Sequence, residues 1–310
     1  MKIAVFGGAG FIGSHFVDKA IYSEAFTQIL VVDSLTYAGN LENLKIALRD
    51  DRVKFIKSDI LSNIEYEDEF TDFDVVVNFA AESHVDRSID NPLLFAQTNS
   101  LGPSVLVNAC MRQNVKRFIQ VSTDEVYGPV ITGESVESSP ILPTSPYAAS
   151  KAAGEIIAIS YWRTYGYPVI VTRGCNTYGS RQYPEKLIPL AIDRLSRNMA
   201  FPQYGNGEQI REWINVEDHA EAILKIALAG EPGEIYNIGT GERISNRDLL
   251  FTIARILGAD VNLIQTAKDR LGHDFRYALD SSKIASELSW SPSRTLQKSI
   301  AECSTWLEKN

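Results

Sequence analysis

A tyrosine and a lysine four residues apart are the first pair in this sequence that could do acid–base chemistry. Tyr147 and Lys151 stand in the segment YAASK, and this spacing puts both side chains on one face if the segment is helical. A tyrosine ordinarily loses its proton near a pH of about 10, but a neighbouring ammonium stabilises the phenolate. The pair therefore predicts a tyrosine base, although the same spacing also occurs on solvated helix faces.

Two adjacent carboxylates offer a second source of chemistry. Asp124 and Glu125 stand in STDEVYG, directly after the apolar run RFIQVS. The chain either leaves the core for water at this point or delivers two acids to a site. In a site, neighbouring carboxylates can act as acid and base if their environments separate their pKa values. The hydroxyl residues Ser122 and Thr123 end the run, and together with the nucleotide-binding pattern below they strengthen the catalytic interpretation of Tyr147.

A glycine-rich turn near the start of the chain predicts a dinucleotide site. GGAGFIG places Gly7, Gly10 and Gly13 directly after an apolar strand and at the start of a helix. Glycine permits a tight turn and close backbone approach, and the helix N-terminus attracts a pyrophosphate. Asp33 ends the next strand, where a carboxylate takes the ribose hydroxyls. Asp33 would repel a 2′-phosphate, and Ser34 rather than an arginine follows it, so NAD is predicted over NADP.

Asp59 ends a third apolar run, VKFIKSD, and is open to two interpretations. Its carboxylate could accept a hydrogen bond from the adenine amine of the dinucleotide. It could equally cap the helical segment that follows, since aspartate is a favoured N-cap residue.

The segments that must position these residues alternate between short apolar strands and amphipathic helical stretches. The strands are KIAVFG, ILVVD, VKFIKSD, DVVVNFAA, RFIQVS and YPVIVTRG, and such runs are typical of strands buried on both faces of a parallel sheet. We predict an α/β fold, a Rossmann-like doubly wound parallel sheet with a smaller C-terminal substrate-binding domain. The NAD-binding domain is expected over 1–173 plus about 213–240, and the other over about 174–212 plus 241–310.

The composition narrows the partners and the compartment. The 310 residues carry a formal net charge of −9, which argues against nucleic acid or an anionic membrane as a partner. Cys110, Cys175 and Cys303 are few, odd in number and widely spaced, so neither disulfides nor a metal site is predicted. The chain opens MKIAVFGG, already a strand, and no apolar run approaches the ~20 residues that span a bilayer. We therefore expect a cytoplasmic protein without a signal peptide.

The motifs resemble those of the extended short-chain dehydrogenases/reductases, the NAD-dependent epimerase/dehydratase family. Within it, STDEVYG, FAAESHVDRSI, SLTYAGN, YPEKLIPL, YGNGEQIREW and DRLGHDFRYALD closely resemble the dTDP-glucose 4,6-dehydratases. The Thr-Asp-Glu triplet is the most specific part, because related 4-epimerases and decarboxylases share the Tyr and Lys but lack the acid pair. The resemblance implies a lyase of deoxysugar biosynthesis that uses NAD and a nucleotide-diphosphate sugar. It also implies a homodimer paired through the helical stretches LLFAQTNSLGPSVLVNACMRQ and SPYAASKAAGEIIAISYWRTYG.

The resemblance also implies roles for individual residues. The catalytic set is Thr123, Asp124, Glu125, Tyr147 and Lys151, with Glu125 as the base at sugar C5 and a protonated Asp124 as the acid at the C6 hydroxyl. The implied NAD site consists of Gly7, Gly10, Phe11, Ile12, Gly13, Asp33, Ser34, Leu35, Thr36, Gly39, Asp59, Ile60, Ala80, Ala81, Thr98, Tyr147 and Lys151. The implied nucleotide-sugar site consists of Ser83, His84, Asn176, Lys186, Leu187, Pro202, Tyr204, Arg211, Asn246, Arg270 and His273. Arg211 and Arg270 would hold the diphosphate, which guanidinium groups bind in a bidentate manner.

The sequence departs from the dehydratase pattern at four places. Gly174, Cys175 and Thr177 replace the usual Cys, Ser and Asn; Ser180 and Arg181 replace a proline and an aromatic residue; Leu271 replaces a proline; and the loop 129–144 is short. The first two departures are expected near the nicotinamide and the sugar, so they bear on the substrate more than on the reaction type. Cys175 could be a nucleophile, but we expect no histidine to activate it, and a small pocket-lining residue is the better interpretation.

Other functions remain open at this point. A UDP-sugar 4,6-dehydratase, a 4-epimerase or a decarboxylase would use the same fold with a different substrate or outcome. A non-catalytic NAD-binding sensor belongs to another class, and it would have no need of the acid pair.

Overall fold

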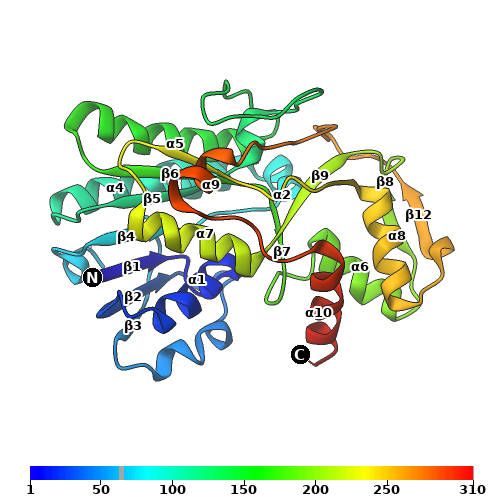
Figure 1. Cartoon of the computed structure of the whole chain (residues 1–310), viewed down its shortest axis with the longest axis horizontal. Coiled ribbons are helices and arrows are strands. Elements are labelled where there is room, and N and C mark those ends of the chain that lie inside the picture. Colours follow the sequence, from blue (N-terminus) through cyan, green and yellow to red (C-terminus); the bar gives the residue numbers. More distant parts are fainter. Residues whose placement is uncertain (63–65, 310) are drawn as a thin grey trace.

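A seven-stranded parallel sheet forms the centre of the computed structural model, which describes residues 1–62 and 66–309 (Figure 1). In spatial order its strands are β10 (Ile235–Ile238), β6 (Val169–Gly174), β5 (Phe118–Thr123), β4 (Val75–Asn78), β1 (Lys2–Phe6), β2 (Gln28–Asp33) and β3 (Val53–Lys57). Every neighbouring pair is parallel. Each apolar run picked out in the sequence forms one of these strands, which confirms the expected Rossmann-like α/β sheet.

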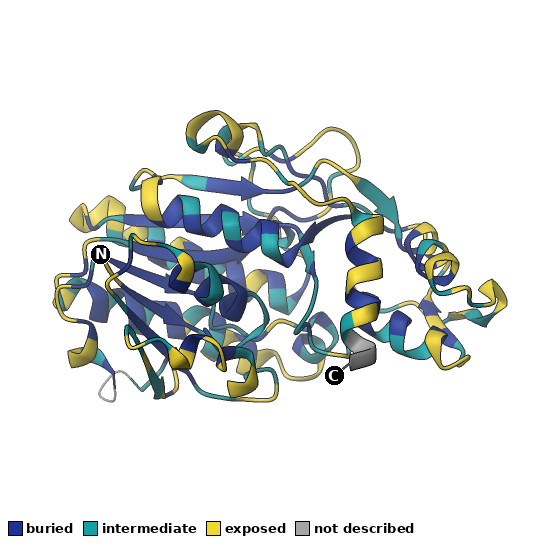
Figure 2. Cartoon of the chain, turned by 60° about the horizontal axis from the view of Figure 1, so that its bottom comes forward, coloured by how far each residue is buried: buried dark blue, intermediate teal, exposed yellow. Residues whose placement is uncertain are grey.

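Helices cover both faces of this sheet. Helices α1 (Phe11–Tyr22) and α7 (Val216–Ala229) pack on one face, and α4 (Gly102–Arg112) and α5 (Pro146–Tyr165) pack on the other. In β1, Val5 belongs to the apolar cluster on the α1 side, and its neighbour Phe6 belongs to the cluster on the α4 side. Because successive side chains of a strand point to opposite faces, burial of both faces requires apolar residues throughout. Strands β1, β2, β4, β5, β6 and β10 are accordingly mostly dark blue in Figure 2, whereas the edge strand β3 is only partly buried.

The strand order reverses beside β1. From β1 the chain moves outward through β2 and β3, then returns to β4 on the other side and continues through β5 and β6. In open α/β sheets, ligands bind at the carboxyl ends of the strands next to such a reversal. The glycine turn follows β1, Asp33 ends β2, and Asp124 follows β5, so the predicted cofactor and catalytic residues all lie at this edge.

Five short strands that the sequence did not predict form two small sheets. They are β7 (Asn176–Tyr178), β9 (Ile210–Asn215) and β11 (Arg243–Ser245) in one sheet, and β8 (Phe201–Tyr204) and β12 (Ile264–Ala267) in the other. Helices α6 (Leu187–Ser196), α8 (Asn246–Leu257) and α10 (Leu296–Lys309) pack around a third apolar cluster, on the right in Figure 1. Most of these strands have three or four residues, which is too short to show a two-residue hydrophobic period.

The remaining elements are short. They are α2 (Val85–Asp90), α3 (Pro92–Ala96), α9 (Ser282–Leu288), the π-helical turn η5 (Gln97–Leu101), and the 3-10 helices η1 (Leu41–Leu44), η2 (Ala47–Arg49), η4 (Glu67–Phe70), η6 (Asp124–Tyr127) and η7 (Val261–Leu263). The helical stretch after β4, expected as one run, is thus interrupted by η5 between α3 and α4. None of the helices in the described part of the chain is long and apolar enough to cross a membrane.

Helix α5 has strong local signals at both ends. The Ser145 side chain accepts a hydrogen bond from the backbone N–H of Ala148 (3.1 Å) and so caps the first turn. Gly166 ends the helix in the left-handed conformation, with φ +67°. These ends fix the register of the helix, so that Tyr147 lies in its first turn and Lys151 one turn later on the same face.

Candidate active site

The turn after β1 brings the backbones of two strands very close together. Gly7 has φ +74°, in the left-handed region that glycine adopts at no steric cost. A Cβ on Gly7 would lie 2.5 Å from the backbone nitrogen of Ala80, and a Cβ on Gly13 would lie 2.2 Å from the carbonyl oxygen of Gly7. Gly10 is the N-cap of α1 and carries no side chain, which leaves the first N–H groups of the helix accessible to a pyrophosphate.

Asp33 organises this turn from the end of β2. Its Oδ2 accepts a hydrogen bond from the N–H of Ala9 (2.9 Å), and its Oδ1 accepts one from the N–H of Leu35 (2.8 Å). Burial raises the pKa of Asp33, and the hydrogen bonds from backbone N–H groups oppose that shift. Gly39 approaches closely, because a Cβ there would lie 2.6 Å from Oδ1 of Asp33. The carboxylate thus ties the glycine turn to the loop after β2.

The other residues of the implied NAD site lie at the same edge of the sheet. Phe11 and Ile12 begin α1; Ser34, Leu35, Thr36 and Gly39 follow β2; Asp59 and Ile60 follow β3; Ala80 and Ala81 follow β4; and Thr98 lies in η5. Asp59 accepts a hydrogen bond from the N–H of Leu61 (2.8 Å), and residues 60 and 61 form a turn. Its side chain is exposed, so this hydrogen bond does not prevent contact with a ligand, and both interpretations stay open.

Asp33→Ala is expected to weaken NAD binding. The substitution removes the acceptor for the ribose hydroxyls, and each such hydrogen bond is worth about 0.5–1.5 kcal/mol, or more to a charged acceptor. Isothermal titration calorimetry would measure the loss, with Asp51→Ala as the control, because Asp51 is exposed and precedes β3 at the opposite edge of the sheet. Unchanged NAD affinity in Asp33→Ala would move the ribose contact to another residue.

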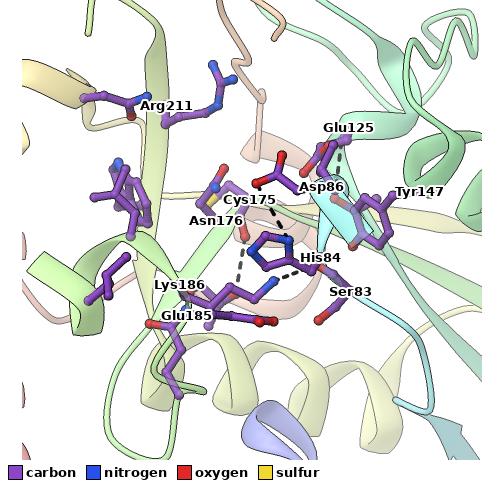
Figure 3. A pocket seen from close by; sticks show the side chains of 18 of the residues that line it. Ser83, His84, Asp86, Glu125, Tyr147, Cys175, Asn176, Glu185, Lys186 and Arg211 are labelled. Atoms are coloured by element: carbon purple, nitrogen blue, oxygen red, sulfur yellow. Dashed lines mark hydrogen bonds and ion pairs between the residues drawn. The ribbon is translucent and has the colours of Figure 1, made fainter. Parts of the chain in front are cut away.

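Thr123, Asp124 and Glu125 lie where β5 ends and η6 begins. The Thr123 hydroxyl accepts a hydrogen bond from the N–H of Glu125 (3.3 Å) and lies 3.2 Å from Oδ1 of Asp124. Thr123 also hydrogen-bonds the phenolic oxygen of Tyr147. Glu125 and Tyr147 lie together on one side of the pocket in Figure 3. Thr123 therefore links the acid pair to the tyrosine that the sequence placed on a different element.

The two acids have different environments. Asp124 is 3% exposed, and its Oδ2 has no hydrogen-bond partner within residues 1–62 and 66–309. Burial, followed by the charges of Glu125 and Glu212, raises the pKa of Asp124 well above its usual value. Burial also raises the pKa of Glu125, but the positive charges of Arg270 and Arg211 oppose that shift. Asp124 therefore holds its proton to higher pH than Glu125, as an acid and a base sharing one site require.

Tyr147 and Lys151 differ from expectation in one respect. Burial, followed by the charge of Glu125, raises the pKa of Tyr147, whereas the spacing predicted a lowering by Lys151. The Nζ of Lys151 donates a hydrogen bond to the carbonyl of Val121 (2.7 Å), and burial lowers the pKa of this lysine to about 8. In the protein alone, burial and the neighbouring carboxylates thus set the pKa of Tyr147, and the expected lowering, which also involves the positive nicotinamide ring, stays a prediction for the NAD-bound protein. The positive ring of a bound NAD⁺ would act in the opposite direction.

A cavity of about 520 Å³ lies between the edge of the large sheet and the small sheets. Its lining includes Thr123, Asp124, Glu125, Tyr147, Phe11 and Ile12. It also includes every residue of the implied nucleotide-sugar site, namely Ser83, His84, Asn176, Lys186, Leu187, Pro202, Tyr204, Arg211, Asn246, Arg270 and His273. The fold therefore brings the predicted catalytic residues and the predicted nucleotide-sugar residues into one cavity.

Cationic side chains converge on this cavity. Arg211 is buried, and its guanidinium donates a hydrogen bond to the carbonyl of Asp274 (2.8 Å). The Nε of Arg270 is buried and has no hydrogen-bond partner among the described residues. The Nζ of Lys186 donates to the carbonyl of Ser83 (2.6 Å), as Figure 3 shows, and burial lowers the pKa of this lysine to about 8. Buried cations with spare donors suit an anionic group such as a diphosphate.

Two acidic residues on the cavity wall were not assigned from the sequence. Oε2 of Glu185 accepts a hydrogen bond from Arg87 (2.7 Å), whereas its Oε1 is buried without a partner in the described part of the chain. Asp86 accepts a hydrogen bond from the phenol of Tyr204 (3.2 Å). Both residues stand inside motifs quoted for the resemblance, YPEKLIPL and FAAESHVDRSI, so their position in those motifs could have found them.

The sequence placed no histidine to activate Cys175, and the structure brings one only as far as the residue before it. His219, on the first turn of α7, lines the cavity and lies against Gly174, the residue before Cys175. Burial nevertheless raises the pKa of the Cys175 thiol well above its usual value, so the structure gives no activated nucleophile. No sequence motif pointed to His219, because it comes from an ordinary amphipathic helix.

Comparison with known proteins agrees with this geometry. The family model described as GDP-mannose 4,6 dehydratase matches residues 4–303. The dTDP-glucose 4,6-dehydratases of Actinoplanes sp. and Streptomyces niveus are 45% and 42% identical to this chain, over 100% of it and 98% and 94% of their own lengths. The chain belongs to the GDP-mannose 4,6 dehydratase family. Its resemblance to NAD-dependent dehydratases is thereby confirmed.

A solved structure within this group supports the fold of the dehydratase. DesIV, a dTDP-glucose 4,6-dehydratase from Streptomyces venezuelae crystallised with NAD bound, aligns with a TM-score of 0.97 at 43% identity. The alignment covers 100% of this chain and 98% of that one. The glycine turn and Asp33 fit NAD in this chain as well, because a Cβ at Gly7 or Gly13 would clash with the backbone of Ala80 or Gly7 and disrupt the turn that presents the N-terminus of α1 to a pyrophosphate.

One departure from the dehydratase pattern lies away from the cavity. Ser180 and Arg181 were expected near the reacting groups, but they do not contribute to the cavity lining. Arg181 forms an ion pair with Asp18 of α1 (2.6 Å), and the carbonyl of Ser180 lies 3.0 Å from Nε2 of His15 on the same helix. These two residues therefore fasten their loop to α1, and neither lines the cavity of the protein alone.

Proposed function

We propose that the protein is an NAD-dependent hydro-lyase that converts dTDP-glucose into dTDP-4-keto-6-deoxyglucose in deoxysugar biosynthesis. The observation that carries this proposal is the contact of Thr123 with both Tyr147 and Asp124 at the wall of one cavity. A base suited to alcohol oxidation and an acid pair suited to elimination can thus act on one substrate. Bound NAD supplies a reversible store for one hydride, which leaves C4 first and reaches C6 last.

The side chains of this site perform the proton transfers. The positive ring of a bound NAD⁺ would favour the phenolate of Tyr147, and in that form Tyr147 accepts the proton of the C4 hydroxyl as the sugar is oxidised. The new ketone makes the C5 hydrogen acidic, because the carbanion is delocalised into the carbonyl. Glu125 takes the C5 proton, while protonated Asp124 gives its proton to the C6 hydroxyl, which leaves as water. Glu125 then returns a proton to C5, and the site regains its starting charges as Asp124 and Tyr147 exchange protons with solvent.

The substrate's nucleotide end is assigned to the cationic side of the cavity. Arg211 and Arg270 would bind the diphosphate, and the unpartnered Nε of Arg270 leaves a donor free for a phosphate oxygen. Tyr204 is 42% exposed, and its ring lies 6.2 Å from that of His273, which leaves an aromatic surface for stacking on the base. The Oδ1 of Asn246 is buried without a partner among the described residues, so it can accept a hydrogen bond from the nucleotide.

Mass spectrometry of the products tests this function. Purified protein with added NAD is incubated separately with dTDP-glucose, UDP-glucose and UDP-glucuronate. Loss of one water from dTDP-glucose is the expected result. Loss of water from UDP-glucose alone would identify a UDP-sugar dehydratase, inversion at C4 without a mass change would identify an epimerase, and loss of carbon dioxide would identify a decarboxylase. NAD binding without any turnover would point to a sensor.

We also propose that the protein is a homodimer that pairs through α4 and α5. Large apolar side chains on this face remain in water in the single chain: Leu101 is 52% exposed and Ile156 is 51% exposed. Ile156 comes from α5, which already covers the large sheet with its other face, and Leu101 ends η5 directly before α4. Apolar groups that exceed what the sheet requires are accounted for by a second copy of the same face.

The double substitution Leu101→Glu with Ile156→Glu is expected to separate such a dimer into monomers, because two charges per chain would be buried at the interface. Multi-angle light scattering at micromolar concentration measures the mass. Ile131→Glu is the matched control, since Ile131 is 67% exposed on a loop outside α4 and α5 and should leave the dimer intact. A monomeric mass for the unmodified protein would count against the dimer itself.

The division into two domains and the cytoplasmic location remain part of this proposal. The chain leaves the large sheet after β6 and returns to it through α7 and β10, which supports an NAD-binding domain made of two segments. The boundary near residue 213 falls within β9, so it is better drawn at the start of α7. Three free, buried cysteines support a reducing compartment.

A further inference from the structure

The end of β6 places a histidine beside the reacting groups. Gly174 is the last residue of β6 and pairs in register with Thr123 of β5. His219 projects toward Gly174 from the first turn of α7 and lines the same cavity as Thr123 and Tyr147. Helix α7 packs against α1, whose first residues, Phe11 and Ile12, also line the cavity.

The imidazole reaches this position because residue 174 is glycine. A Cβ on Gly174 would lie 2.5 Å from Cε1 and 2.6 Å from Nε2 of His219. Contacts this short do not occur between a Cβ and neighbouring atoms, so any side chain at position 174 would displace the ring. Gly174 is also one of the positions at which this chain departs from the dehydratase pattern, and His219 occupies the space that a side chain there would fill.

The hydrogen bonds of His219 define which ring nitrogen carries the proton. His219 is 2% exposed, and burial lowers its pKa to about 4, so the ring is neutral near pH 7. Its Nδ1 lies 2.7 Å from Oγ1 of Thr177, and that hydroxyl donates to the carbonyl of Cys175 at 3.3 Å. A hydroxyl has a single proton, so with Thr177 donating to the Cys175 carbonyl we assign the tautomer in which Nδ1–H donates to Thr177. Nε2 is then a bare acceptor.

This acceptor, Nε2 of His219, is buried and makes no hydrogen bond with the described residues. A buried polar atom left without a partner costs stability, so such atoms usually serve a ligand or an ordered water. The donors that reach the cavity during the reaction are the amide of the nicotinamide and the hydroxyls of the sugar.

We propose that His219 is a ligand-binding residue whose Nε2 accepts a hydrogen bond from an N–H or O–H donor of the bound reactants. The proximity of α1 favours the carboxamide NH₂ of the nicotinamide as that donor, and a sugar hydroxyl is the other source of the same chemistry. The contact would hold the reacting ring beside Thr123 and Tyr147. This inference rests on the NAD-dependent function proposed above.

An NAD analogue tests the nicotinamide arm without any measurement of activity. In 3-acetylpyridine adenine dinucleotide a methyl group replaces the carboxamide NH₂, so the analogue cannot donate to Nε2. Calorimetry is expected to show that the unmodified protein prefers NAD to the analogue by about 2- to 12-fold, the range of one neutral hydrogen bond. In His219→Leu the two dinucleotides should bind equally, and His219→Gln, which keeps an acceptor, should restore part of the preference.

The sugar arm compares dTDP-glucose with dTDP on the NAD-loaded protein. If a sugar hydroxyl is the donor, His219→Leu reduces the preference for dTDP-glucose and leaves the dinucleotide ratio unchanged. His15→Leu is the control, because His15 is another buried histidine, at 3% exposed, and its two ring nitrogens contact Glu217 and Ser180 outside the cavity lining. Both ratios should stay at the unmodified values in this variant.

Two results would overturn the assignment. One is a folded His219→Leu protein in which both ratios equal those of the unmodified protein. The other, which needs no variant, is a ¹⁵N NMR spectrum of the unmodified protein in which Nε2 of His219 does not shift when NAD and dTDP-glucose are added. Failure of the unmodified protein to bind NAD at all would instead reject the proposed function.

Discussion

Tyr147→Phe is expected to abolish oxidation of the sugar at C4 while NAD binding is retained. The substitution removes the phenolic oxygen that Thr123 contacts and keeps the aromatic ring, which packs edge-on against Phe95 at 6.3 Å between centroids. Loss of a general base typically slows a step by roughly 10²–10⁴-fold. The appearance of NADH absorbance in a single turnover with dTDP-glucose measures the step directly.

Tyr127→Phe is the matched control for that experiment. Tyr127 is a buried tyrosine close to the acid pair in sequence, and its phenol donates a hydrogen bond to Asn237 (2.7 Å) outside the cavity lining. It should lose some stability, of the order of 1 kcal/mol for one hydrogen bond, and keep its rate of C4 oxidation. Near-normal product formation by Tyr147→Phe would show that another group accepts the C4 proton.

Asp124→Asn and Glu125→Gln are expected to stop dehydration at two different points. Both variants retain Tyr147, so C4 oxidation remains possible in each. Without Glu125 the C5 hydrogen cannot leave, and solvent deuterium should not enter C5 of the 4-keto intermediate. Without the proton of Asp124 the C5 position still exchanges, but the C6 hydroxyl remains a poor leaving group. Each change should slow elimination by roughly 10²–10⁴-fold.

Mass spectrometry and proton NMR of the sugar in deuterated water separate these outcomes. The two variants should resemble each other in lost dehydration and differ in deuterium at C5. The raised pKa of Asp124 gives the physical reason, because an acid that is buried beside Glu125 and Glu212 keeps the proton it must donate. Equal exchange in both variants, or full dehydration by either, would refute the division of labour between the two carboxylates.

The features that short stretches encode could be predicted from the sequence. The parallel sheet follows from apolar runs separated by amphipathic segments, and Gly7, Gly13 and Asp33 are placed by their positions at the ends of the first two strands. Tyr147 and Lys151 share a helix face because four residues make about one turn. In each of these cases the residues that matter are close in sequence, so local geometry is enough to relate them. Family membership, shown by the comparisons, rests on motifs of the same kind.

Other features depend on which segments the fold brings together. The small sheets pair segments with too few residues to show a period, and they supply the wall that carries Arg211. The adjacency of Asp124 and Glu125 is visible in the sequence, whereas the difference between their pKa values comes from burial and from charges on distant segments. Burial likewise raises the pKa of Tyr147 in the protein alone, which the spacing of Tyr147 and Lys151 does not show.

The contact of His219 with Gly174 shows most clearly what could not be predicted from the sequence. The two residues belong to different elements, and neither stands in a motif that points to the other; only the packing of α7 beside the end of β6 brings the ring into the space that the glycine leaves open. The sequence by itself determined the sheet and the cofactor edge and predicted the reacting groups, because these depend on local spacing. The tertiary structure decided their protonation, their shared cavity and the unassigned acceptor beside them, because burial and long-range contacts exist only once the chain has folded.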